Sequence, residues 1–278
     1  MNAIGVDVGC TKMHLTAKVN GVYVDKRSST GLDCTVEHIK GEIDAFIAEL
    51  PYQVDLLGLA VPGLVDDDKV VKYSDVTNLN GVGIDTFTEG KMYGRIINDV
   101  RAAAWAEIAN YPDHNTIAVI MSGTGIAVGV YTNGEMVVGG SGYAGELGYC
   151  ILNERNSEPQ TVDDLAGGAS ILRQANCEAI ELLDRLAKNE PEATRIIRDA
   201  GRYFGYTLTN IQHLFNPEIV VVGGATATYP GYMEEALRAV EKYTIKDIFK
   251  SCQIVKAKDN KRVVALGAIE FAKRAFAE

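Results

Sequence analysis

The sequence predicts a two-domain α/β protein. Candidate strands alternate with candidate helices along the chain, and one short pattern occurs twice, once in each half. The first copy spans 3–21 and the second spans 117–134. Each copy reads as a strand, a turn of small residues with a threonine, a second strand and an Asn-Gly hairpin. The 278 residues are enough for two domains of ordinary size with buried cores.

The repeated pattern predicts two three-stranded meanders, over 2–30 and 116–138. When the threonines of the two turns are aligned, the two Asn-Gly steps coincide without a gap. The aligned positions are Thr11 with Thr124 and Asn20-Gly21 with Asn133-Gly134. Asn-Gly between apolar runs is a strong hairpin signal, because both turn residues need positive φ.

Apolar spacing predicts the remaining elements of the first half. Helical intervals over 35–50 and an alanine-rich run over 100–110 indicate helices. Short apolar runs indicate buried strands over 55–61 and 95–98.

The second half is expected to be mostly helical. The stretch before Gln160 reads as irregular, and helices are expected over 170–188, 192–214 and 232–242. The run 218–222 indicates one further buried strand.

A polar loop with a proline at 111–115 marks a domain boundary. We therefore predict an N-terminal domain over 1–108 and a C-terminal domain with a helical insertion over 109–264. The terminal helix, over 265–278, is expected to pack back on the N-terminal domain.

Composition disfavours several classes of function. The net charge is −10, from 27 basic and 37 acidic residues, and no Lys/Arg cluster stands out, so we expect no nucleic-acid partner. No apolar run reaches the ~20 residues that a membrane span needs, and no secretory leader is recognisable. We therefore expect a cytoplasmic protein without a membrane partner. The five cysteines include no CxxC pair, which indicates neither a disulfide framework nor a zinc cluster.

The two threonine-containing turns are candidate phosphate sites. Backbone N–H groups and a hydroxyl aimed at one point suit phosphate oxygens. Two such turns in one chain indicate a polyphosphate held from both sides. The residues concerned are Gly9, Cys10, Thr11, Gly123, Thr124 and Gly125.

Two charged residues flank the first turn. Asp7 lies at a strand end, where a carboxylate would repel phosphate unless a cation lies between them. It is therefore a candidate Mg²⁺ ligand through water, or else a turn cap. Lys12 either pairs with a phosphate or lies solvated on the hairpin.

Three further segments are candidates for chemistry. Asp99 follows Asn98 where a strand gives way to a helix, so it is either an N-cap or a general base for an attacking hydroxyl. Glu146, in the glycine-dense segment 139–148, either binds sugar hydroxyls or faces solvent in a flexible loop. The pair Gly223-Gly224 would let an adenine or a ribose lie flat against the backbone.

Six groups of motifs, in order, resemble those of the ROK family of sugar kinases and sugar-responsive repressors, within the actin/hexokinase superfamily of ATPases. They are Asp7-Val8-Gly9-Cys10-Thr11-Lys12, Val61-Pro62-Gly63 with Asn78-Leu79-Asn80-Gly81, Asn98-Asp99, Ser122-Gly123-Thr124-Gly125, Ala144-Gly145-Glu146-Leu147-Gly148 and Val222-Gly223-Gly224. The resemblance spans almost the whole chain. It implies an actin-like (ribonuclease H-like) fold, in which each domain is a mixed sheet flanked by helices.

The resemblance also implies an activity. ATP and Mg²⁺ would bind in the cleft between the domains, and the γ-phosphoryl group would pass to a hydroxyl of a sugar or amino sugar. Asp99 would be the general base. The residues implied to bind the acceptor are Asn78, Asn98, Glu146, Tyr149 and Asp163.

The chain departs from the family pattern in several places. Cys10 replaces the second glycine of the first phosphate motif, Tyr149 replaces a histidine that touches sugar and zinc, and Asp163 replaces a sugar-binding glutamate. The zinc loop has no counterpart in 151–162, so we expect no zinc. The chain starts directly at its first strand, without the helix-turn-helix of the repressors, so we expect no DNA binding. Dimers are common in the family, and the oligomeric state stays open.

Two other functions stay open beside the kinase. A catalytically silent sugar sensor or interaction protein is favoured by Cys10, Tyr149 and the missing zinc loop, and disfavoured by the intact Asn98-Asp99. An ATPase without a small acceptor, of the actin or chaperone kind, is disfavoured by the glycine-rich segment that contains Glu146.

Overall fold

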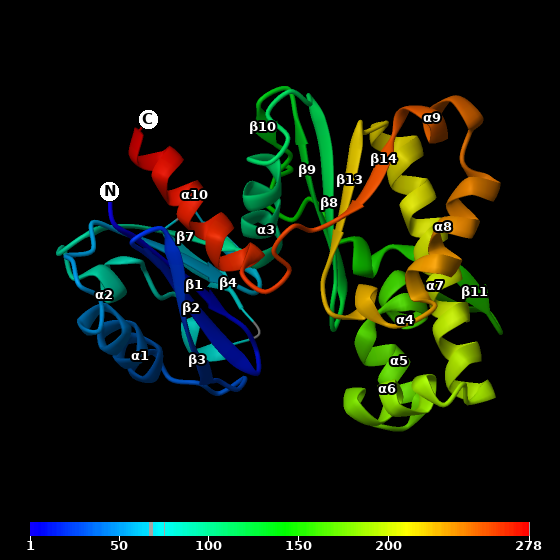
Figure 1. The fold of residues 1–278 in the computed structure, drawn as a ribbon, viewed down its shortest axis with the longest axis horizontal. Helices are drawn as coiled ribbons and strands as arrows, with labels where there is room; N and C mark the ends of the chain where they lie inside the picture. Colours follow the sequence, from blue (N-terminus) through cyan, green and yellow to red (C-terminus); the bar gives the residue numbers. More distant parts are fainter. Residues whose placement is uncertain (67–68, 75, 278) are drawn as a thin grey trace. The chain divides into compact units, whose positions relative to one another are not determined.

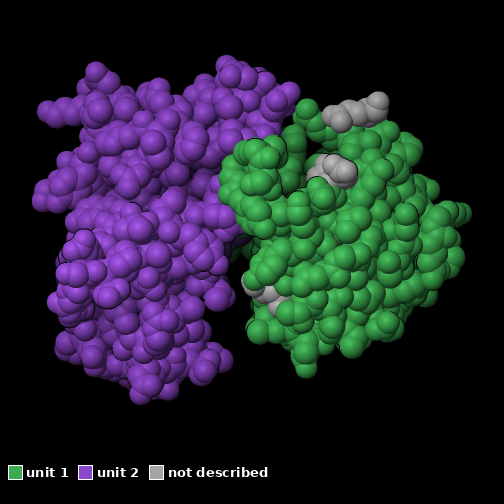
Figure 2. Space-filling view, turned by 180° about the vertical axis from the view of Figure 1, so that it is seen from behind, with its two compact units in different colours: residues 1–112, 138–144, 258–278 green, residues 113–137, 145–257 purple. Residues whose placement is uncertain are grey.

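The computed structural model describes residues 1–66, 69–74 and 76–277. The chain divides into two compact units, shown in different colours in Figure 2. The first unit comprises 1–112, 138–144 and 258–278, and the second comprises 113–137 and 145–257.

The first unit is built on a five-stranded mixed sheet (Figure 1). An antiparallel meander is followed by two strands parallel to β1, in the order β3-β2-β1-β4-β7. The strands are β1 (Ala3–Val8), β2 (Lys12–Val19), β3 (Val22–Ser29), β4 (Leu56–Val61) and β7 (Tyr93–Asn98). The first predicted meander and both predicted buried strands are thus confirmed.

Helices cover both faces of this sheet. On one face, α1 (Val36–Ala48) buries Ile39, Ile43 and Phe46 in the same hydrophobic cluster as the apolar side chains of β1 and β2. The other face is covered by α3 (Asp99–Ile108) and α10 (Val263–Ala277). The smaller elements of the unit are β5 (Leu64–Asp66), β6 (Val70–Tyr73), the 3-10 helix Thr77–Leu79 and α2 (Asp85–Thr88).

Helix α10 lies so close to its neighbours that only glycine fits at three contacts. A Cβ atom added at Gly5 of β1 or at Gly58 of β4 would clash with the backbone of α10. One added at Gly267 of α10 would clash with the backbone of Ala102 in α3. The three glycines therefore fix the position of α10 in the first unit.

We expect Gly58→Ala to lower the free energy of unfolding by about 3 kcal/mol, because the added methyl group must displace helix backbone rather than a flexible side chain. A urea titration measures the change. Gly41→Ala, at an exposed position in α1 where nothing lies within 4 Å of the added Cβ, is the control. It is expected to stabilise the protein by about 0.5–1 kcal/mol. Similar effects of the two substitutions would contradict this account of α10.

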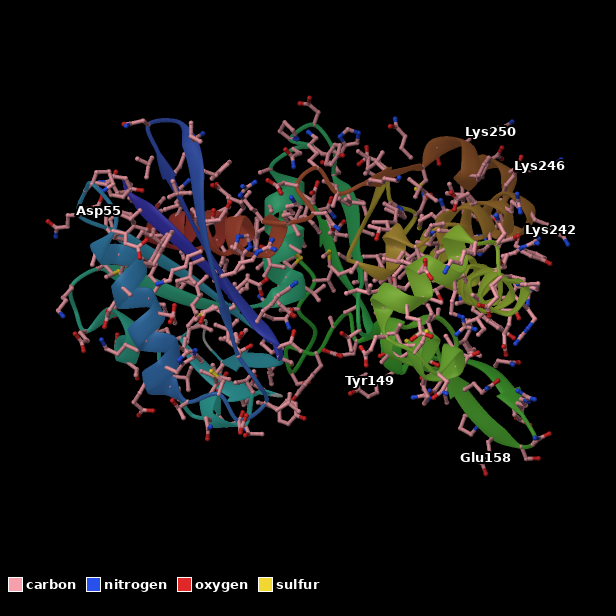
Figure 3. The ribbon with its side chains drawn as sticks, turned by 60° about the horizontal axis from the view of Figure 1, so that its bottom comes forward. Asp55, Tyr149, Glu158, Lys242, Lys246 and Lys250 are labelled. Carbon is pink, nitrogen blue, oxygen red and sulfur yellow. The ribbon has the colours of Figure 1, made fainter. Side chains whose placement is uncertain are left out.

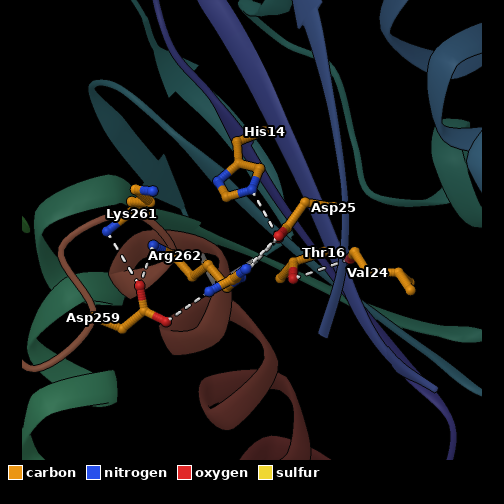
Figure 4. Close-up of polar contacts among 7 residues, drawn as sticks. All are labelled: His14, Thr16, Val24, Asp25, Asp259, Lys261 and Arg262. Carbon is orange, nitrogen blue, oxygen red and sulfur yellow. Dashed lines mark hydrogen bonds and ion pairs between the residues drawn. The ribbon is translucent and has the colours of Figure 1, made fainter. Parts of the chain in front are cut away.

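A polar cluster ties the start of α10 to β2 and β3 (Figure 4). Arg262 donates through Nε and Nη2 to the carboxylate of Asp25 and through Nη1 to Asp259 at 3.0 Å. The ring of the buried His14 lies with Nε2 3.0 Å from Oδ1 of Asp25. The hydrogen bonds from Arg262 are the largest cause that lowers the pKa of Asp25 below its ordinary value.

This shift predicts a pH dependence of stability. Because the pKa of Asp25 is lower in the folded protein, its stabilising contribution is present above the ordinary pKa and is lost as pH falls toward the folded value. We expect Asp25→Asn to be clearly destabilised at pH 7 and the difference from wild type to shrink by pH 3. Urea titrations at both pH values measure this. A difference that stays constant or grows in acid would argue against the ion pair.

The second unit repeats the strand order of the first. Its sheet has the order β10-β9-β8-β13-β14, again a meander followed by two strands parallel to the first strand of the meander. The strands are β8 (Thr116–Ser122), β9 (Ile126–Thr132), β10 (Glu135–Met136), β13 (Ile219–Gly223) and β14 (Gln253–Lys256). The second predicted meander is confirmed, with a third strand of only two residues.

The two Asn-Gly hairpins have the backbone conformation that the sequence predicts. Asn20 and Gly21 have φ of 49° and 85°, and Asn133 and Gly134 have φ of 52° and 91°. Two successive residues with positive φ are the requirement of a type I′ turn.

Helices make up most of the rest of the second unit. They are α4 (Val162–Ala166), α5 (Gly168–Ala175), α6 (Ala179–Ala187), α7 (Pro191–Phe215), α8 (Tyr232–Tyr243) and α9 (Lys246–Ser251). The single helix predicted over 170–188 is wrong, because Asn176 adopts φ 48° and ends α5 before α6 begins. Within the described ranges, no helix combines the length and the hydrophobicity needed to cross a bilayer.

The segment before α4 is a β-hairpin rather than the predicted irregular stretch. β11 (Ile151–Arg155) and β12 (Glu158–Thr161) pair antiparallel, and the turn residues Asn156 and Ser157 both have positive φ. Figure 3 shows Glu158 near the tip of this hairpin. Most of its residues are polar, so the alternation of apolar and polar residues that reveals a half-buried strand is absent.

Candidate active site

The first candidate phosphate turn joins β1 to β2. Gly9 donates its N–H to the carbonyl of Lys12 at 3.0 Å and closes the turn. Thr30, just after β3, donates its hydroxyl to the carbonyl of Gly9 at 2.6 Å and its N–H to the carbonyl of Thr11 at 3.1 Å. The two carbonyl oxygens are thus paired with donors from the protein, which lowers the negative potential that a phosphate would meet there.

Cys10 fits this turn without strain. Its backbone does not adopt positive φ, so the position does not require the glycine that the family pattern has there. Its partly buried side chain packs against the hydrophobic cluster of the first unit. The thiol therefore packs on the protein side of the turn.

Asp7 lies at the end of β1, opposite His14 in the ladder between β1 and β2. Burial is the largest cause that raises its pKa to about 7, the nearby carboxylate of Asp99 raises it further, and Lys12 opposes the shift. Two carboxylates that repel each other at the edge of a phosphate turn favour a divalent cation, and oxygen ligands are what Mg²⁺ prefers. Among the described residues, no group of three or more His, Cys, Asp or Glu side chains could hold a metal ion. A Mg²⁺ ion beside Asp7 would therefore keep most of its water ligands.

The junction between β7 and α3 settles which residue caps the helix. Oδ1 of Asn98 accepts the N–H of Arg101 at 3.0 Å, so Asn98 is the N-cap and Asp99 is the first helical residue. The capping alternative for Asp99 is therefore wrong. The other side-chain atom of Asn98, Nδ2, donates to the carbonyl of Gly63 at 2.9 Å. Both the oxygen and the nitrogen of the Asn98 side-chain amide are thus hydrogen-bonded within the protein.

Asn78 holds the loop that precedes α1. Its Nδ2 donates to the carbonyls of Asp33 at 2.8 Å and Cys34 at 3.3 Å. The loop borders a cavity of about 300 Å³ lined by residues 29–31, 33–35 and 38. Since Thr30 both lines this cavity and braces the first turn, the cavity adjoins the candidate phosphate site.

The second candidate phosphate turn joins β8 to β9 and is braced in the same manner. The carbonyl of Gly123 accepts the N–H of Gly168 at 2.9 Å and the hydroxyl of Thr226 at 2.8 Å. The carbonyl of Thr124 accepts the N–H of Ala169 at 3.0 Å. In both units, therefore, carbonyl oxygens of the turn are paired by donors from a distant part of the same unit.

Asp163 of α4 connects this turn to the segment that contains Glu146. Its Oδ1 accepts the N–H of Ile126 at 2.7 Å. A Cβ atom added at Gly125 would lie 2.8 Å from its Oδ2, and one added at Gly148 would clash with the same carboxylate. Burial is the largest cause that raises the pKa of Asp163. The carboxylate of Asp163 contacts other parts of the protein. These contacts suit a role in positioning the second turn.

The segment with Glu146 is held by its backbone and presents its side chains to solvent. Gly145 has φ 101°, lies against the backbone of Val128 and accepts the N–H of Val128 at 2.9 Å. Leu147 is buried, whereas Glu146 and Tyr149 are exposed. Figure 3 shows Tyr149 on the surface. Both side chains are accessible from solvent.

The pair Gly223-Gly224 has a packing role at the end of β13. Gly224 has φ 94°, and an added Cβ atom would clash with the backbone of Ser122. Ser122 lies with its hydroxyl 3.2 Å from that of Tyr232, which donates to the carbonyl of Ala166 at 2.9 Å. Gly224 therefore lets the chain pass close to the backbone at the start of the second turn.

Sequence reasoning missed the donors that brace the turns. They are Thr30, Gly168, Ala169 and Thr226. Each lies about 20 to 100 residues from its partner, and nothing in the local pattern marks it. The recurrence of a threonine soon after β3 and β13 is the only signal available, and a single sequence makes it weak.

The fold and these two turns define the class of protein. Two mixed sheets of the same strand order, each with a braced turn between its first two strands, form a two-domain actin-like ATPase fold. The model of the ROK family matches residues 3–275, and the chain belongs to that family.

Relatives of the chain include both regulators and enzymes. It is 23% identical to the xylose repressor of Bacillus spizizenii, over 95% of this chain and 75% of that protein. It is 22% identical to the N-acetylmannosamine kinase of Salmonella typhi, over 84% of this chain and 87% of that protein.

Solved structures agree with this assignment of the fold. A ROK family glucokinase from Streptomyces griseus, in complex with glucose and AMPPNP, has a TM-score of 0.83 and 21% identity. The alignment covers 99% of this chain and 100% of that one. At this identity the likeness shows the fold alone.

Proposed function

We propose that this protein is an ATP-dependent kinase that phosphorylates a hydroxyl of a sugar or amino sugar. The observation that carries the proposal is the neighbouring pair Asp7 and Asp99 beside a braced turn in the first unit. Family membership and the kinases among the relatives support it. The proposal places the reaction in the cytoplasm, where ATP is present, and includes no nucleic-acid partner.

Asp99 acts as the general base in this proposal. Asn98 is the N-cap of α3, so the Asp99 carboxylate is not needed for that role. Asp99 accepts the N–H of Val100 at 2.8 Å through Oδ1, which orients the carboxylate. A carboxylate fixed at a helix start can take the proton of a sugar hydroxyl as that oxygen attacks phosphorus.

Asp7 supplies the ligand for Mg²⁺, through water. The ion, when bound, neutralises charge on the phosphate oxygens. Lys12, whose charge acts on Asp7, pairs with a phosphate in this proposal. Burial is the largest cause of the raised pKa of Asp7, and repulsion from the carboxylate of Asp99 raises it further. A bound cation would reduce this repulsion.

In this proposal each braced turn, Gly9–Thr11 in the first unit and Gly123–Gly125 in the second, is a binding site for nucleotide phosphate, and Gly223-Gly224 faces an adenosine. Each turn offers backbone N–H groups and a threonine hydroxyl, while its carbonyls are paired within the protein. The acceptor contacts Glu146 and Tyr149, which are exposed. Asn98, Asn78 and Asp163 act mainly by holding the segments around it.

Product analysis tests the proposal. The protein is incubated with MgATP and a mixture of hexoses, N-acetylhexosamines and pentoses, and the products are analysed by mass spectrometry. One phosphorylated sugar, with ADP released in equal amount, is expected. ATP hydrolysis that does not depend on any sugar would instead support an ATPase without a small acceptor.

A sugar sensor without catalysis is the second candidate. The xylose repressor among the relatives favours it. The packing of Cys10 disfavours the sensor. Its side chain lies against the hydrophobic cluster of the first unit, so the replacement of glycine by cysteine does not fill the phosphate side of the turn. Calorimetry that showed sugar binding, with no phosphorylated product at any sugar tested, would select the sensor.

A further inference from the structure

A row of arginines lies along one face of α7 in the second unit. Arg195, Arg198 and Arg202 are spaced by three and four residues, so their side chains share one side of the helix. Arg238 of α8 joins them by pairing with the same carboxylate as Arg198. The chain as a whole carries a net charge of −10.

Two carboxylates hold these four guanidinium groups. Asp199 accepts from Arg195 at 3.3 Å and from Arg202 at 2.7 Å. Glu235 accepts from Arg198 at 2.8 Å and from Arg238 at 2.7 Å.

The arginine cluster, defined by these four arginines and two acids, is therefore positively charged. Each carboxylate is shared by two arginines, so the cluster has an excess of two positive charges. The side chain of Glu235 is only 15% exposed, whereas that of Arg198 is 58% exposed. Glu235 thus lies beneath its arginines, whereas the side chain of Asp199 is 37% exposed. The guanidinium groups reach solvent with donors to spare.

The surface of the arginine cluster is concave and lies in the N-terminal half of the long helix α7. A cavity of about 370 Å³ is lined by residues 189, 191, 194, 195, 198, 199, 202 and 235. Pro191 opens the 25-residue helix α7, and the side chain of Glu190 does not cap it. Glu190 pairs with Arg185 instead. The first turn also carries Glu192, and the field of a helix end falls off within one turn, so the arginines supply the positive charge of this surface.

We propose that the arginine cluster is a binding site for a small anion that carries a phosphate group, separate from the candidate active site. Guanidinium forks match phosphate oxygens in pairs, and the three arginines and two acids that line the cavity leave one positive charge in excess. The cavity volume is of the order that takes a phosphorylated sugar or similar metabolite, since ligand sites begin at roughly 300 Å³.

Titration calorimetry at low ionic strength tests the proposal, with inorganic phosphate and glucose 6-phosphate as probes. The test variant is Arg195→Gln with Arg198→Gln. It removes two cluster charges yet leaves Asp199 paired with Arg202 and Glu235 paired with Arg238, so the fold is expected to persist. We expect at least a tenfold loss of affinity for both probes, with an unchanged thermal unfolding midpoint.

Two controls locate the site. Lys188→Gln with Lys242→Gln removes the same charge from positions outside the cavity and should bind as wild type. Lys12→Gln alters only the candidate phosphate turn of the first unit, so the binding that the arginine variant loses should persist in it. The Arg→Lys version of the test variant keeps the charge without the fork, so an intermediate affinity is expected even if the Gln variant does not fold.

Four results would overturn the proposal. They are no binding of either probe at millimolar concentration, equal loss in the lysine control, loss in Lys12→Gln alone, and wild-type affinity in the arginine variants. Light scattering is measured in parallel. A change from dimer to monomer in the arginine variants would assign the cluster to an interface between copies instead.

Discussion

Asp99→Asn is expected to lower kcat by roughly 10²–10⁴-fold, the range that general-base catalysis contributes. The KM for sugar should change little, because asparagine has nearly the same size and can still accept a hydrogen bond from Val100. The helix start should also survive, since Asn98 provides the cap. ADP release with the preferred sugar measures kcat and KM.

Asp85→Asn is the matched control for this substitution. Asp85 is also the first residue of a helix in the same unit, and its side chain is exposed. It should leave both constants unchanged. Full activity in Asp99→Asn would remove Asp99 from the chemistry, whereas the same loss in both variants would point to helix stability.

The second large effect is expected at Asp163. Asp163→Ala should raise the KM for ATP by roughly ten- to hundredfold, because an unsatisfied buried donor costs about 1–3 kcal/mol and the second turn loosens. Asp163→Asn should remain close to wild type, since its side-chain oxygen can still accept the N–H of Ile126. Steady-state kinetics and calorimetry with AMPPNP measure the two effects separately.

This pair of variants separates a positioning role from direct contact with the acceptor. If the charge of Asp163 binds sugar, then Asp163→Asn should lose as much sugar affinity as Asp163→Ala. The neighbouring Asp164→Ala is the control, because Asp164 completes a capping box with Thr161 at the start of α4. It should cost about 1 kcal/mol of stability and leave KM unchanged.

Much of the fold could be predicted because its signals are local. Each Asn-Gly pair predicts two positive φ values from adjacent residues alone. The spacing of apolar residues in α1 predicts which face of the helix is buried. The hairpin of β11 and β12 could not be predicted, since strands that are polar on both faces carry no periodic signal. The break at Asn176 was missed because a single residue in the left-handed conformation interrupts an otherwise continuous helical pattern.

The candidate site was predictable in its turns but not in the contacts that hold them. The pattern around Thr11 and Thr124 marks both turns from sequence alone. The partner of Ile126 is Asp163, 37 residues away, and such a pairing appears only once the chain is folded. Which of Asn98 and Asp99 caps the helix also depends on side-chain orientation, which adjacent residues of similar type leave undecided.

The close fit of α10 has a consequence for synthesis on the ribosome. The first unit is assembled from three stretches of chain, and α10 belongs to the one made last. Until α10 docks, the sheet surface at Gly5 and Gly58 is exposed, because glycine has no side chain to cover it. The second unit, by contrast, has all its residues by position 257. We therefore expect the sheet of the first unit to remain open to chaperones until α10 docks on it, whereas the second unit can close without α10.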